Sequence, residues 1–101
     1  MVYNKLVRDK IPDIINAQGE TPNFRILERE EYLRCLEEKL DEEAGEYHCD
    51  KTPEELADIL EVVYALAAAH GCSESELQQL REEKRRARGG FDGRIFLISK
   101  E

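Results

Sequence analysis

A chain of 101 residues is long enough for one domain and too short for two. Its 15 basic and 23 acidic residues give a net charge of −8, which argues against binding to nucleic acid or to an anionic membrane, because both usually require a basic face. No apolar run approaches the roughly 20 residues that span a bilayer, no signal peptide is visible, and the 3 cysteines fit reduced thiols, so we expect a cytoplasmic protein.

The first element expected along the chain is a short helix over residues 9–17. Ile11, Ile14 and Ile15 fall on one side of this helix. Pro12 suits its first turn, where the missing N–H group breaks no helical hydrogen bond. This segment therefore predicts a small amphipathic helix before a polar turn.

Two short apolar runs are compatible with β-strands. One covers residues 24–27, and the other covers residues 94–98 near the C-terminus. An isolated two-stranded ribbon is weak unless it packs on something. We therefore expect these runs to pair with each other and to lie against helices.

From about residue 28 the apolar residues recur at helical spacing. Leu33, Leu36, Leu40 and Tyr47 form one line along the second expected helix. The charge-rich stretch around them keeps this period, which favours a helix over disorder. A small domain with such a helix needs partner helices to cover its apolar side.

Two more helix starts follow. Thr52 and Pro53 are typical of an N-cap and a first helical position, and this third helix should end near His70. Ser73 and Glu76 form the pattern of a capping box that opens a fourth helix, which ends at a pair of glycines. The sequence thus predicts a single domain over residues 1–101: an all-α bundle of about four helices with a minor two-stranded β ribbon.

Acidic residues occupy positions where these helices should be apolar. Glu43 takes a place in the apolar line of the second helix, and Glu46 lies one turn further on. Glu55 and Asp58 share a face of the third helix with Ile59. Because a short connection joins the two helices, the two i, i+3 pairs can converge when the helices pack antiparallel.

Four converging carboxylates favour a bound cation. Like charges and burial both disfavour ionisation, and a hard divalent cation removes that cost. Carboxylate oxygens suit Mg²⁺, or Mn²⁺, and helical bundles build metal sites from inward-facing glutamates. Any one of these acids alone is more often a solvated surface residue, or a first-turn residue favoured by the helix dipole. The paired arrangement shifts the interpretation towards a metal site.

These residues also carry a resemblance to a known family. Residues 43–46 (Glu-Ala-Gly-Glu) and 55–58 (Glu-Leu-Ala-Asp) resemble the paired acidic motifs of MazG-like all-α nucleoside triphosphate pyrophosphohydrolases, a group related to phosphoribosyl-ATP pyrophosphohydrolase. Residues 3–12 and 84–91 resemble a subgroup of short MazG-like proteins. The resemblance therefore extends over nearly the whole chain, and it implies a single MazG-like domain.

The resemblance implies a metal-dependent acid-anhydride hydrolase. Its reaction would split the α–β phosphoanhydride of a nucleotide, giving a monophosphate and pyrophosphate. Glu43, Glu46, Glu55 and Asp58 would then hold Mg²⁺, with Mn²⁺ as the other candidate. Glu43 and Glu46 are the candidates for orienting or deprotonating the attacking water.

Basic residues provide candidates for phosphate binding. We expect this role for Lys5, Arg8, Lys39 and Arg88, because arginine forks and lysine ammonium groups suit phosphate oxygens. Basic side chains at the end of the fourth helix could equally complement its dipole. The sequence leaves these two interpretations of Arg88 open.

Oligomers and competing functions complete the expectations. The third helix is too apolar for a lone bundle, and the resemblance implies dimers or tetramers, so we expect a homodimer or homotetramer. The resemblance also implies a nucleotide substrate, and the acidic charge argues against nucleic acid and membrane as partners. One alternative is a non-catalytic helical interaction or regulatory module. The other is a phosphoribosyl-ATP pyrophosphohydrolase of histidine biosynthesis.

Overall fold

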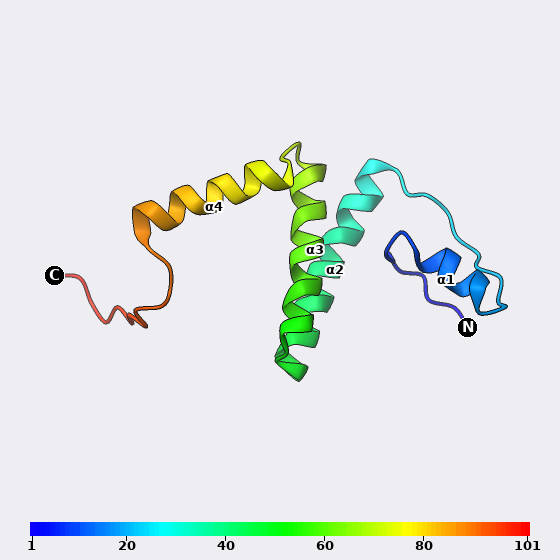
Figure 1. The fold of residues 1–101 in the computed structure, drawn as a ribbon, viewed down its shortest axis with the longest axis horizontal. Helices are drawn as coiled ribbons and strands as arrows, with labels where there is room; N and C mark the ends of the chain where they lie inside the picture. The colour runs from blue at the N-terminus through cyan, green and yellow to red at the C-terminus, as the bar shows by residue number, and fades with distance from the viewer.

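The structure is a computed structural model that describes residues 1–101, and all its regular secondary structure is helical. Figure 1 shows that two of the helices form an antiparallel hairpin, while the other two lie to either side of it. The expectation of an all-α chain with four helices is confirmed. In chain order these are α1 (Ile11–Ala17), α2 (Arg29–Asp50), α3 (Pro53–Ala69) and α4 (Glu74–Arg88).

The α2–α3 hairpin holds the small core of the chain. Leu36 on α2 and Val62 on α3 are the only buried apolar residues, at 3% and 7% exposure. The hairpin turns at Lys51, whose positive φ of 53° places it in the left-handed region and ends α2. At the other end of the hairpin, Arg29 Nη1 donates to the carbonyl oxygen of Ala69 at 2.7 Å. The turn at one end and this hydrogen bond at the other therefore hold α2 and α3 side by side.

Helix α4 leaves the hairpin instead of packing along it. Gly71 adopts a φ of 79° that reverses the chain after α3. The Ser73 side chain then accepts from the Glu76 N–H, and the Glu76 carboxylate accepts from the Ser73 N–H, so the expected capping box is present. The axes of α3 and α4 are bent by 106°, which carries the end of α4 away from α2 and α3 (Figure 1).

The expected two-stranded ribbon is wrong for this structure. Residues 24–27 and 94–98 contain no strand, and they lie on opposite sides of the α2–α3 hairpin (Figure 1). Most of their apolar side chains are open to solvent, with Ile26 at 85% and Ile98 at 90% exposure. A strand needs a neighbour for its backbone groups, and in a molecule 62 Å long these two runs cannot reach each other.

A membrane-spanning helix was not expected, and no single helix is long and apolar enough to cross a bilayer. Helices α3 and α4 meet the criteria of length and composition only when joined as one sharply bent pair.

Candidate metal site

A carboxylate stands among the three buried residues of the chain. Glu43 is 8% exposed, and it continues the line of Leu36 along the α2 face that packs on α3. Its Oε2 atom is shielded from solvent and has no hydrogen-bond partner. A shielded carboxylate oxygen without a donor costs free energy unless a cation or a proton satisfies it.

Helix α3 brings two more carboxylates to Glu43. Glu55 and Asp58 lie one turn apart at the start of α3, where Thr52 is the N-cap and Pro53 the first helical residue. Each of the three acids offers an oxygen atom, and these atoms all lie within 4.8 Å of one another. We call Glu43, Glu55 and Asp58 the carboxylate cluster. The Oε2 atom of Glu55 is also shielded and without a partner.

Glu46 lies beside the carboxylate cluster and outside it. The structure leaves Glu46 exposed, and its carboxylate is not among the oxygens within 4.8 Å of one another. Its negative charge is nevertheless close enough to raise the pKa of both Glu43 and Glu55. The structure therefore brings together three of the four expected ligands and places the fourth at the rim.

Burial and the charges of neighbouring carboxylates raise the pKa of the two glutamates of the cluster. Burial raises the pKa of Glu43 above its ordinary value, Glu46 raises it further by its charge and a hydrogen bond, and Asp58 adds a smaller contribution in the same direction. Lys39 opposes these effects. Burial is also the first cause that raises the pKa of Glu55, followed by the charges and hydrogen bonding of neighbouring carboxylates.

The cluster has the chemistry and the size of a magnesium site. Carboxylate oxygens are preferred ligands of Mg²⁺, and in an octahedral site with bonds of about 2.1 Å two ligands stand at most about 4.2 Å apart. The oxygens within 4.8 Å would need only a small inward shift of flexible side chains. Two shielded oxygens without donors supply the acceptors that a cation would satisfy. The residues present therefore fit a hard divalent cation.

Three of the four expected phosphate-binding residues surround the cluster. Lys39 Nζ lies 3.5 Å from the Oε1 atoms of both Glu42 and Glu43. Lys5 Nζ lies 3.8 Å from Glu42 Oε1, and Arg8 Nη2 donates to Asp58 Oδ1 at 2.6 Å. The N-terminal segment thus places two cations against the acidic ends of α2 and α3, although α1 itself packs on neither helix.

Arg88 is the exception among the expected phosphate-binding residues. It is the last residue of α4, and α4 packs on α3 but not on α2. Figure 1 shows this end of α4 well away from the N-terminal half of α3, where the carboxylate cluster lies. Within one chain the bend between α3 and α4 therefore keeps Arg88 out of the site.

Sequence reasoning missed Asp50. This last residue of α2 is one of the neighbouring acids that raise the pKa of Glu55. Asp50 follows Glu46 by four residues, which places both on one face of α2. That spacing was the available signal, because it extends the acidic face of α2 by one more turn.

The comparisons with known proteins give no function. No family model matches the chain, and no solved structure matches it. A protein of Mycolicibacterium smegmatis described only as uncharacterized is 48% identical over 48 residues, which cover 48% of this chain. The chain spans about half the length of this curated relative, since the match covers 49% of it. The function is therefore argued from the site.

Proposed function

We propose that the protein is a Mg²⁺-dependent nucleotide pyrophosphohydrolase. The observation that carries this proposal is the carboxylate cluster, with two shielded oxygens that have no partner and with basic side chains around it. Structural carboxylates are normally exposed or paired. Three acids gathered across a helix hairpin, with Glu43 buried and the other two half-buried, support a site that holds a cation and an anionic substrate.

Each acid has a role that follows from its position. Glu43, Glu55 and Asp58 would hold the cation, and Mn²⁺ could replace Mg²⁺ because both take oxygen ligands. The cation would polarise phosphoryl oxygens and lower the pKa of a bound water. Glu46, exposed at the rim, is free to accept a proton from the attacking water and becomes our first candidate for the general base.

The basic side chains would bind the phosphates of the substrate. Lys39 has only 18% of its side chain exposed, so its ammonium group is already held at the site. Arg8 has 57% of its side chain exposed and can swing from Asp58 to a phosphate, with which it forms a bidentate contact. Attack of water on the α–β phosphoanhydride would then release pyrophosphate and leave the nucleoside monophosphate.

The test is pyrophosphate release from a panel of nucleoside triphosphates and phosphoribosyl-ATP, with Mg²⁺, with Mn²⁺ and with a chelator. Wild type is compared with Asp58→Asn and Glu43→Gln, and Glu38→Gln is the matched control because it makes the same charge change at an exposed position of α2. We expect metal-dependent release that falls at least about 100-fold in the first two variants and is unchanged in the control.

Two other outcomes would change the proposal. Release confined to phosphoribosyl-ATP would assign the protein to histidine biosynthesis. A folded wild type that binds metal but releases pyrophosphate from no substrate would replace the proposal with a non-catalytic interaction module.

We place the protein in the cytoplasm, where reduced cysteines and nucleotides coexist.

A further inference from the structure

No backbone hydrogen bond ties residues 1–20 to the rest of the chain. Every backbone bond that these residues make stays within the segment, as in the turn where the Ile11 N–H donates to the Arg8 carbonyl oxygen. Helix α1 packs on none of the other helices, and Figure 1 shows it beside the α2–α3 hairpin on the side opposite to α4. The position of the N-terminal segment therefore depends on its side chains.

Two ion pairs hold this segment against the hairpin, one on each arm. Lys5 Nζ lies 3.8 Å from Glu42 Oε1 on α2, and Arg8 Nη2 lies 2.6 Å from Asp58 Oδ1 on α3. The segment makes no other ion pair or side-chain hydrogen bond to the hairpin. An exposed ion pair shifts an equilibrium by only about 1.4- to 5-fold, so the loss of one pair is enough to loosen the segment.

Both ion pairs end on acids of the candidate metal site. Asp58 belongs to the carboxylate cluster, and Glu42 directly precedes Glu43 on α2. Carboxylate oxygens that lie within 4.8 Å of one another repel, and a positive charge beside them relieves this repulsion. In the metal-free chain the Arg8 guanidinium supplies that charge at Asp58, so Arg8 and a metal ion compete for the same carboxylate.

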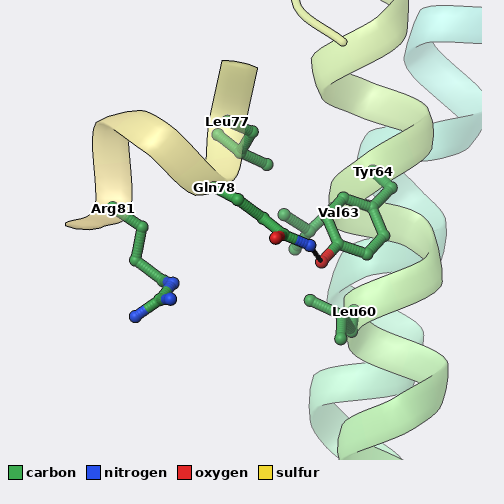
Figure 2. Close-up of a pocket in the computed structure, with 6 residues that line it drawn as sticks. All are labelled: Leu60, Val63, Tyr64, Leu77, Gln78 and Arg81. Atoms are coloured by element: carbon green, nitrogen blue, oxygen red, sulfur yellow. Dashed lines mark hydrogen bonds between the residues drawn. The ribbon is translucent and has the colours of Figure 1, made fainter. Parts of the chain in front are cut away.

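Helix α4 is attached to the hairpin by contacts of another kind. Figure 2 shows the groove of about 450 Å³ between α3 and α4, with Leu60 and Val63 on one side and Leu77 on the other. Across it, Gln78 Nε2 donates to the Tyr64 hydroxyl at 2.9 Å. None of these groups is charged, so a cation at the carboxylate cluster should leave the junction between α3 and α4 unchanged.

We propose that residues 1–10 form a strap that a divalent cation releases from the site. Without metal the strap lies over acids of both arms, because Arg8 pairs with Asp58 and Lys5 pairs with Glu42. When the cluster holds a cation, the charge of Asp58 is neutralised and the Arg8 guanidinium is repelled, so the strap loses the shorter of its two ion pairs. Release frees Arg8 for the substrate phosphates, a step that rests on the proposed function.

Nuclear magnetic resonance of the ¹⁵N-labelled full chain tests this release without any measurement of activity. In chelator, the backbone order parameters of residues 3–9 should stay well above about 0.6, the value below which a backbone is flexible. In excess Mg²⁺ they should fall below it. The Arg8 Nε–Hε signal should shift at the same time, because the guanidinium leaves Asp58. NaCl brings the chelator sample to the same ionic strength, because salt alone weakens exposed ion pairs.

The chain contains a matched control for the Arg8–Asp58 pair. Arg25 Nη2 also lies 2.6 Å from a carboxylate oxygen, Glu31 Oε2, and the side chains of this pair are exposed to a similar degree. Glu31 is about 18 Å from Glu43 along α2, so the Arg25 Nε–Hε signal should not respond to Mg²⁺. Without metal, Arg8→Ala should give the mobile strap that wild type shows only in Mg²⁺, whereas Arg25→Ala should leave the strap ordered.

The outcomes separate this inference from the proposed function. A strap that is equally ordered with and without Mg²⁺, or already mobile in chelator, would overturn the inference. Amide signals of the carboxylate cluster that do not respond to Mg²⁺ would overturn it as well. Release of the strap by Mg²⁺ in a protein that produces no pyrophosphate would retain the inference and reject only the activity.

Discussion

Replacing Glu43 by glutamine should have opposite effects on stability with and without metal. At 4.8 Å, two unit charges repel by about 3.5 kcal/mol at an effective dielectric constant near 20 and by about 1 kcal/mol in bulk water. Lys39, whose Nζ is 3.5 Å from Glu43 Oε1, offsets part of this repulsion. We therefore expect Glu43→Gln to stabilise the metal-free protein by about 1 kcal/mol, or about 4–8 °C in Tm.

In excess Mg²⁺ the wild type should become more stable than Glu43→Gln, the reverse of the order without metal. A ligand at 100 times its Kd stabilises a protein by about 2.7 kcal/mol, and Glu43→Gln should lose most of this gain because the amide has no negative charge and one oxygen fewer to offer the cation. Circular dichroism melts in chelator and in excess Mg²⁺ measure both effects, with Glu38→Gln as the control for loss of an exposed charge. The reasoning would be refuted if Glu43→Gln melted below wild type in chelator while both proteins gained equally from Mg²⁺.

Three further predictions follow from the contacts. Arg8→Ala removes the ion pair that competes with a metal ion for Asp58. Isothermal titration should therefore show Mn²⁺ binding about two- to fivefold tighter, while kcat/KM falls because a phosphate-binding group is lost. Weaker Mn²⁺ binding would contradict this competition. The pKa values of Glu43 and Glu55 are raised in the folded chain, so the folded state binds protons more readily than the unfolded state. The metal-free protein should therefore gain stability as the pH falls from neutrality towards the ordinary glutamate pKa. Thermal melts in which stability falls over this pH range would disprove the prediction. Ser73→Ala removes a cap bond of α4 and should cost about 1 kcal/mol in urea unfolding, whereas an unchanged midpoint would mean that α4 is held by other contacts.

Sequence patterns predicted the starts of α3 and α4 because both helices begin with local signals. The Ser73–Glu76 pair and Pro53 act within one turn, so no tertiary information is needed to place them. The conflict between charge and position at Glu43 also identified the buried acid correctly. Local rules were sufficient at these positions.

Other features depended on distances that a sequence does not contain. The 106° bend after α3 separates residues 24–27 from 94–98 and removes Arg88 from its own chain's site. Glu43 and Glu46 project from α2 in directions about 60° apart around the helix axis. This angle decides that the carboxylate of Glu43 joins the cluster while that of Glu46 stays at its rim. Helical spacing alone cannot tell which of these neighbouring faces turns inward.

The turn at Lys51 has a consequence for folding. It makes the carboxylate cluster a local structure, since every member lies between residues 43 and 58 on the two arms of one hairpin. Contacts of low sequence separation form early and close only a short loop. The acidic half of the site should therefore assemble with the hairpin, and a cation bound there would stabilise the hairpin independently of where α4 packs.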